Sequence, residues 1–194
     1  MTYVPKILAF AGSARKDSVN KKLAAIAAHG ATVAGADVTL IDLRDFPMPI
    51  YDGDLEGDQG LPENALKLKD LMKQHDGFLI ASPEYNSSIA PLLKNTIDWV
   101  SRPSQGEPML AAFTGKVAGL MSASPGGLGG LRGLVHVRMI LGNIGVIVIP
   151  DQVAVAGAFG AFDENGQLKD AKQQASVERI GSAVADLLRK LKSE

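Results

Sequence analysis

Cysteine is absent from the 194 residues of this sequence. The chain therefore has no disulfide, no thiolate nucleophile, no iron–sulfur cluster and no zinc site that uses cysteine. Any redox activity must then belong to a bound cofactor, because the side chains themselves offer no redox couple.

An excess of charge of one sign is also lacking, because 20 Lys and Arg stand against 21 Asp and Glu, for a formal net charge of -1. A near-neutral chain does not generate the basic field that non-specific binding to a nucleic acid requires. It also has no acidic tail of the kind found in solvating proteins. We therefore expect no nucleic-acid partner.

Long apolar runs are missing as well. The best candidate, 144–149, contains Gly145 and stops at Pro150, whereas a membrane-spanning helix needs about 20 apolar residues. The first ten residues carry one Lys and a few apolar residues, too few for the core of a signal peptide and its cleavage site. We expect no membrane partner and a cytoplasmic location.

Short runs of apolar and β-branched residues alternate along the chain with stretches of helical period. The runs are 7–11, 37–43, 76–81, 116–121 and 145–149. Apolar residues at steps of three or four recur between them, from Leu61 to Met72 and again from Val177 to Leu191. This alternation predicts an α/β fold: a doubly wound, five-stranded parallel sheet in the flavodoxin-like order 2-1-3-4-5, formed by a single domain over residues 1–194.

In such a sheet, ligands bind outside the carboxyl ends of the strands, near the point where the strand order reverses. The loop after the first strand runs from Gly12 to Asn20 and enters a helix. Its polar side chains are Ser13, Arg15, Ser18 and Asn20. Hydroxyls, an Arg and free N–H groups at a helix N-terminus form an anion site.

Two interpretations of this first loop remain open. Ser18 taken alone is better explained as a helix cap, with Gly12 supplying a turn. The whole set favours a phosphate site, because a cap explains neither the Arg nor the crowding of hydroxyls. The string that binds nucleoside triphosphates, Gly, four residues, then Gly-Lys-Ser/Thr, is absent, so we expect a monophosphate.

The loop after the third strand, 82–91, contains Pro83, Glu84, Tyr85 and Asn86. Taken singly, Tyr85 and Asn86 are explained equally well by an ordinary surface turn. Their position opposite a predicted phosphate site favours a second interpretation, because an aromatic ring and an amide there suit a planar heterocycle. A role for Glu84 as general base is disfavoured, because no partner that would raise its pKa is visible.

The loop after the fourth strand, 122–132, holds Ser122, Ser124, Gly126 and a pair of glycines. Its spacing does not match the dinucleotide-binding fingerprint G-x-G-x-x-G, because counting from Gly127 the sixth position holds Arg132 in place of Gly. The alternatives are a flexible linker and a loop that allows close backbone approach. We favour close approach, because linkers do not normally separate a core strand from a buried helix.

Two further patterns bear on chemistry and assembly. His29, His75 and His136 fall in separate predicted helices or at their ends, so they form neither a metal site nor a catalytic triad, and we expect each at the surface or an interface. The stretch 128–141 is apolar on more than one helical face, which predicts an oligomer interface.

The motifs together resemble one known family. Gly12-Ser13-Ala14-Arg15-Lys16-Asp17-Ser18-Val19-Asn20 is similar to the G-S-x-R-x-x-S-x-N signature of the NADPH-dependent FMN reductases, which include bacterial quinone, chromate and azo-dye reductases. Similar family strings are Pro83-Glu84-Tyr85-Asn86, then Leu93-Lys94-Asn95-Thr96-Ile97-Asp98-Trp99, then Gly129-Gly130-Leu131-Arg132, with Pro49-Ile50-Tyr51-Asp52 earlier in the chain.

This resemblance implies a flavodoxin-like fold, tightly but non-covalently bound FMN, and a homodimer or homotetramer in which the partner subunit helps to enclose the flavin. It assigns Ser13, Arg15, Ser18 and Asn20 to the FMN phosphate, and Gly12 of the same loop is also expected to contact the cofactor. It assigns Pro83, Glu84, Tyr85 and Asn86 to the isoalloxazine, and Ser122, Ser124 and Gly126 to the ribityl chain and pyrimidine edge.

The implied activity is hydride transfer from NADPH or NADH through FMN N5 to a quinone or a similar electrophilic small molecule, with ping-pong kinetics. No catalytic side chain and no metal are expected, because the cofactor carries the chemistry. The alternative is a flavodoxin-type electron carrier without an NAD(P)H site, although such carriers are expected to be strongly acidic. A phosphoreceiver domain is rejected, because the acidic cluster it needs after the first strand is replaced by Ala11-Gly12-Ser13.

Overall fold

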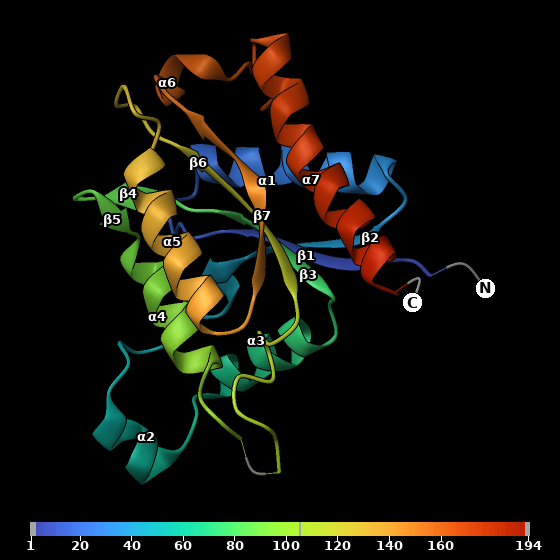
Figure 1. Ribbon diagram of the computed structural model, residues 1–194. Helices are drawn as coiled ribbons and strands as arrows, with labels where there is room; N and C mark the ends of the chain where they lie inside the picture. The colour runs from blue at the N-terminus through green and yellow to red at the C-terminus, as the bar shows by residue number, and fades with distance from the viewer. Residues whose placement is uncertain (1–2, 105, 193–194) are drawn as a thin grey trace.

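The computed structural model describes residues 3–104 and 106–192 (Figure 1). A five-stranded parallel sheet in the order β2-β1-β3-β6-β7 lies at its centre. The strands are β1 (Lys6–Ala11), β2 (Asp37–Asp42), β3 (Gly77–Ala81), β6 (Val117–Ala123) and β7 (Ile147–Val155). This order is the one predicted from the sequence, so the flavodoxin-like fold is confirmed.

Helices cover both faces of the sheet (Figure 1). The helices α1 (Val19–Val33) and α7 (Ala171–Lys192) pack on one face. On the other face lie α3 (Glu63–Lys73), α4 (Pro91–Val100) and α5 (Leu131–Asn143). Successive side chains of a strand point to opposite faces, so Ile7 belongs to the first core and Leu8 to the second.

The helices α1 and α7 touch through glycines. A Cβ at Gly181 would lie 1.9 Å from the carbonyl oxygen of Ala27, and one at Gly30 would lie 2.1 Å from that of Glu178. The two backbones therefore approach more closely than any side chain would permit. This contact fixes α1, whose N-terminus faces the carboxyl end of the sheet.

The last strand, β7, continues through Pro150 and is longer than the predicted 145–149. Its register shifts, because Ala118 pairs with Val148 while Leu120 pairs with Gln152. The extra residues form a bulge on an edge strand, the place where a sheet tolerates proline. Arg138 of α5 donates to the carbonyl oxygens around this bulge, at 2.8 Å from Ile149 and 3.3 Å from Pro150.

Several short elements were not predicted from the sequence. They are a hairpin of β4 (Glu84–Tyr85) and β5 (Ser88–Ile89), the 3-10 turn η1 (Leu43–Asp45), α2 (Gly53–Gln59) and α6 (Ala158–Ala161). The helix α2 projects from the body of the molecule (Figure 1). Its residues are all exposed or half-buried, and its sequence has no apolar repeat from which a helix could be predicted.

Two polar networks hold the connections next to α4. Asn95 and Trp99 both donate to the carbonyl oxygen of Pro49 at 2.8 Å, and the N–H of Tyr51 donates to Asn95 Oδ1 at 2.8 Å. The string Leu93–Trp99, singled out by the family resemblance, therefore positions the loop after β2. Its Asn and Trp act here as structural residues.

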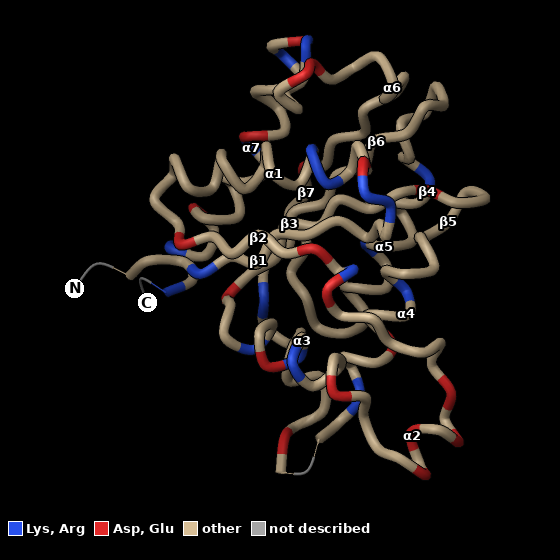
Figure 2. The backbone as a smooth tube through the Cα atoms, turned by 180° about the vertical axis from the view of Figure 1, so that it is seen from behind, with Lys and Arg blue, Asp and Glu red and all other residues tan. Residues whose placement is uncertain are grey.

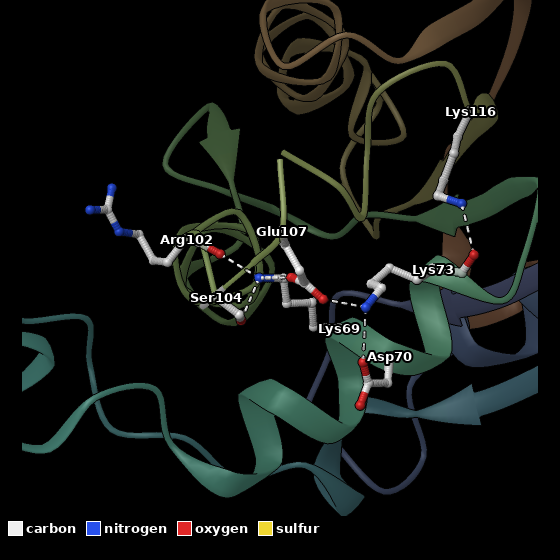
Figure 3. Close-up of polar contacts among 7 residues, drawn as sticks. All are labelled: Lys69, Asp70, Lys73, Arg102, Ser104, Glu107 and Lys116. Carbon is white, nitrogen blue, oxygen red and sulfur yellow. Dashed lines mark hydrogen bonds and ion pairs between the residues drawn. The ribbon is translucent and has the colours of Figure 1, made fainter. Parts of the chain in front are cut away.

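The second network pins the connection from α4 to β6, at the amino end of the sheet (Figure 3). The ammonium of Lys69 is buried and donates to the carbonyl oxygen of Arg102 at 2.7 Å and to Ser104 Oγ at 2.8 Å. It also forms an ion pair with Glu107 at 2.8 Å, and Glu107 pairs in turn with Lys73. This network lies at the opposite end of the sheet from the predicted ligand loops.

Candidate functional site

The loops after β1, β3 and β6 meet at the carboxyl end of the sheet, as predicted. They enclose a pocket of about 240 Å³. Its lining residues are Ser13, Arg15, Ser18, Val19, Asn20, Glu84, Tyr85, Ala123, Ser124, Pro125 and Phe159. A larger hollow of about 430 Å³ lies between α1 and α7, away from these strand ends, and we place the candidate site in the smaller pocket because the anion donors converge there.

The first loop passes tightly beneath α4. The N–H of Gly12 donates to the carbonyl oxygen of Ala81 at 2.9 Å, and a Cβ at Gly12 would lie 2.8 Å from Leu93 Cβ. Ser18 caps α1, since its hydroxyl accepts from the N–H of Asn20 at 3.3 Å. The capping interpretation of Ser18 is therefore confirmed, and the cap places its hydroxyl at the helix N-terminus on the wall of the pocket.

Asn20 joins two of the loops. Its side-chain NH₂ donates to the carbonyl oxygen of Ala123 at 2.9 Å, and its Oδ1 accepts from the N–H of the same residue at 2.9 Å. Both sides of the amide are thus used to fix the end of β6 against the start of α1. Asn20 shapes the pocket through this pair of hydrogen bonds.

The loop after β3 folds into a two-residue hairpin. Glu84 pairs with Ile89 and Tyr85 with Ser88, and between them Asn86 and Ser87 have φ of 50° and 65°. Two successive residues with positive φ are the hallmark of a type I′ turn, whose twist matches that of the strands. The turn interpretation of Asn86 is confirmed: it lies at the tip of the hairpin, while Tyr85 faces the pocket.

Glu84 and Ser88 hold this hairpin on α5. The carboxylate of Glu84 accepts from Arg132 Nη2 at 2.9 Å and from the N–H of Gly133 at 2.9 Å. Burial opposes the charged form, but these hydrogen bonds and the charge of Arg132 outweigh it, so the pKa of Glu84 is lowered. Ser88 Oγ lies 2.8 Å from Nδ1 of His136. Glu84 is therefore a fixed carboxylate, in agreement with the low weight given to it as a general base.

The loop after β6 contains the close approach that its glycines predict. Gly129 and Gly130 have φ of +61° and +89°, and a Cβ at Gly130 would lie 1.9 Å from Ser122 Oγ. Ser122 is completely buried beneath this glycine, and its hydroxyl has no hydrogen-bond partner among the described residues. Ser124 instead lines the pocket.

The predicted site residues thus fall into two groups. Seven of the twelve line the pocket directly: Ser13, Arg15, Ser18, Asn20, Glu84, Tyr85 and Ser124. The other five, Gly12, Pro83, Asn86, Ser122 and Gly126, lie in the same three loops outside its lining. Phe159 of α6 lines the pocket without having been predicted, because it follows the last strand and lies outside the motif strings that the sequence offers.

The histidines contribute nothing to this pocket. His75 was expected at the surface or an interface but is buried, with Nε2 2.9 Å from Thr39 Oγ1 and Nδ1 2.7 Å from the carbonyl oxygen of Leu71. Over residues 3–104 and 106–192, no group of three or more His, Asp or Glu is arranged to hold a metal ion. None of the helices in the same ranges is both long and apolar enough to cross a bilayer.

The donor set of the pocket fits a phosphomonoester. Hydroxyls of Ser13 and Ser18 and the guanidinium of Arg15 stand at the N-terminus of α1, where the helix dipole and unpaired N–H groups favour an anion. The lining of the same pocket also includes Tyr85 of the hairpin. A phosphate joined to a planar ring, as in FMN, has this combination of an anion and an aromatic surface.

Fold and pocket together define a flavodoxin-like protein with a candidate anion site at the carboxyl end of its sheet. The family model for NADPH-dependent FMN reductase matches residues 5–160. Curated relatives include an NAD(P)H-dependent FMN reductase of Pseudomonas aeruginosa, 33% identical over 188 residues that cover 96% of this chain and 97% of that protein. A quinone reductase of Pseudomonas putida is 32% identical over 189 residues, 95% of this chain and 97% of that one. The chain belongs to the NADPH-dependent FMN reductase family.

A solved structure agrees with this assignment. The flavoenzyme NAD(P)H:(acceptor) oxidoreductase FerB from Paracoccus denitrificans superimposes with a TM-score of 0.80 at 29% identity, over 96% of this chain and 98% of that one. A flavodoxin from the Archaea superimposes with a TM-score of 0.62 at 12% identity, a similarity of fold alone.

Proposed function

We propose that this protein binds FMN in the pocket at the carboxyl end of the sheet and uses NADPH or NADH to reduce quinones or similar electrophilic small molecules. The observation that carries the proposal is that Ser13, Arg15 and Ser18, which lead into the N-terminus of α1, line one pocket together with Tyr85 of the hairpin. Bound FMN supplies the chemistry, accepting a hydride from the nicotinamide and passing two electrons to the acceptor.

The chain's own residues then bind and orient. Ser13, Arg15 and Ser18 hold the phosphate, Asn20 fixes the end of β6 beside them, and Tyr85 covers part of the ring system. Glu84 keeps the hairpin in place and stays ionised, because its two oxygens are bonded to Arg132 and to the N–H of Gly133. Reduction of a quinone to the hydroquinone takes up one hydride and one proton. An ionised Glu84 carries no proton to donate, so solvent would supply it.

Initial-velocity kinetics test this proposal. If NAD(P)H and the quinone use one flavin in turn, double-reciprocal plots at several fixed quinone concentrations are parallel. Intersecting lines contradict a shared site. A flavodoxin-type carrier would hold FMN and show no NAD(P)H oxidation with a quinone present, so the absence of turnover in a yellow protein supports that alternative.

We also propose that the protein is a homodimer or homotetramer assembled through α5. This helix buries Leu134, Val137 and Leu141 against the sheet, while an apolar stripe on its other side stays exposed. The stripe consists of Leu128, Leu131, Val135 and Met139. A contiguous exposed apolar stripe is typical of a subunit interface, and its length along one helix suits a symmetric contact with a second copy.

We place the protein in the cytoplasm with small molecules as its partners. In support of small-molecule partners, Lys and Arg are interspersed with Asp and Glu along the described backbone, and the projecting α2 carries Asp54 and Glu56 in its first turn (Figure 2). Charges of mixed sign do not favour a nucleic acid as a partner.

A further inference from the structure

The site has an aromatic residue from outside the family motifs. Phe159 lies on α6, after the last strand of the sheet, and its side chain lines the pocket together with Tyr85 and Pro125. The ring is 73% exposed. A large apolar side chain left in water beside a pocket of polar donors has a surface that a ligand can cover.

The exposure of Phe159 does not come from a loose segment. The N–H of Ala158 donates to the carbonyl oxygen of Ser124 at 3.1 Å, and the N–H of Ser124 donates to that of Val155 at 3.0 Å. Ala158 before Phe159 in the chain and Phe162 after it are both buried. Phe162 also forms an antiparallel β-bridge with Leu168. The backbone thus holds Phe159 at the rim of the pocket.

The lining of the pocket is of two chemical kinds. Ser13, Arg15 and Ser18 offer hydrogen bonds and charge, while Phe159 and Pro125 offer apolar surface. A phosphate does not use apolar surface, so the ring suits the part of the ligand beyond the phosphate. An apolar contact excludes water and does not depend on charge.

We propose that Phe159 retains the cofactor, packing against the non-phosphate part of bound FMN and slowing its release. This inference rests on the proposed function, because it takes FMN as the ligand of the pocket. It makes α6 part of the binding site, and it gives the loop after β7 a role beside those of the other three loops.

The test measures flavin binding and release with the purified protein, using flavin fluorescence, for FMN and for riboflavin, which lacks the phosphate. Phe159→Ala should raise the FMN dissociation rate roughly tenfold, the effect of removing apolar burial of this size. The same substitution should weaken riboflavin binding by a similar factor, because the contact does not involve the phosphate. Phe159→Leu should give an intermediate effect.

The matched control is Met109→Ala. Met109 is also 73% exposed but lies at the amino end of the sheet, so its removal should leave both flavins unaffected. If Phe159→Ala changes neither dissociation rate by more than about twofold while Arg15→Ala still weakens FMN binding, the role of Phe159 is refuted and the proposed function stands. If the wild-type protein binds no FMN, the proposed function is refuted and this inference with it.

Discussion

At the residue scale, the polar side chains of the pocket have structural partners as well as proposed ligands. Ser18 caps α1, Asn20 ties that helix to β6, and Glu84 ties the hairpin to α5. A binding site built in this way is preorganised, because each group is held before the ligand arrives. Arg15 is the exception, since it is exposed and its guanidinium is available for the phosphate.

Arg15→Ala should therefore weaken the binding of FMN and leave the binding of riboflavin unchanged. Loss of a charge-assisted hydrogen bond to the phosphate should raise the Kd for FMN roughly 10- to 100-fold. Fluorescence titration with both flavins measures this difference. Lys16→Ala is the control, because it removes the same charge from the next residue, which does not line the pocket. Equal losses in the two variants would mean that only general electrostatic attraction is at work.

Glu107 gives a prediction about pH. Hydrogen bonds from Lys69 and Lys73 lower its pKa from 4.5 to about 2. Because the pKa of Glu107 is lower in the folded state, its ionised carboxylate stabilises the fold at pH values above the pKa of the unfolded state. This contribution is lost as the pH falls from about 4.5 towards 2. Glu107→Gln should lower the free energy of unfolding at pH 6 by about 3 kcal/mol, because the buried Lys69 ammonium then keeps only neutral acceptors and has no counter-charge.

The difference in the free energy of unfolding between wild type and Glu107→Gln should then narrow as the pH falls from 4.5 towards 2. Urea denaturation at a series of pH values measures this difference. Glu63→Gln is the control, since Glu63 pairs with Lys67 on the exposed face of α3, where such a pair contributes little. A gap that stays constant over this pH range would show that the carboxylate charge of Glu107 does not stabilise the fold.

At the element scale, the sequence predicted the five sheet strands and the long helices because their apolar residues repeat with a clear period. The elements it missed lack that signal. The helix α2 buries little, the β4–β5 hairpin has two residues per strand, and α6 has four residues. The predicted end of β7 at 149 was wrong, because Pro150 occupies a bulge held by Arg138, a tertiary contact that no local pattern encodes.

The contact between α1 and α7 gives the sharpest prediction for an element. Gly181→Ala should lower the free energy of unfolding by about 3 kcal/mol, because the new methyl group would collide with the backbone of α1 and force the helices apart. Gly57→Ala in α2 is the matched control, because it lies outside the proposed interface. Its Cβ would meet nothing within 4 Å, so this substitution should stabilise the protein by about 0.5 kcal/mol.

Thermal or urea denaturation of the two glycine variants provides the measurement. If Gly181→Ala is no less stable than the wild type, α1 and α7 do not pack as closely as described.

At the scale of the whole molecule, the motifs of the sequence predicted which three loops build the site, and seven of the twelve named residues line the pocket. The sequence could not predict which residues within these loops reach the pocket, or which residues from elsewhere in the chain join them. Whether Ser122 or Ser124 reaches the pocket depends on the path of Gly130 over β6, and Phe159 arrives from a distant part of the chain. Both follow from tertiary packing, which leaves no local signature.

The exposed stripe of α5 makes a prediction about assembly. Val135→Glu should shift the protein to monomers in analytical ultracentrifugation, because a carboxylate buried in an apolar interface without a partner is strongly unfavourable. Leu66→Glu on α3 is the control, since Leu66 is exposed outside this stripe and its substitution should leave the oligomer intact. A wild-type protein that is already monomeric would refute the proposed interface.

The most direct test of the central claim is an anaerobic titration followed by visible absorption. The account predicts that the FMN-loaded protein is yellow, that one equivalent of NADPH or NADH bleaches the flavin absorption, and that one equivalent of a quinone restores it. A protein that binds no FMN, or one that keeps its yellow colour in the presence of both nucleotides, would contradict the account.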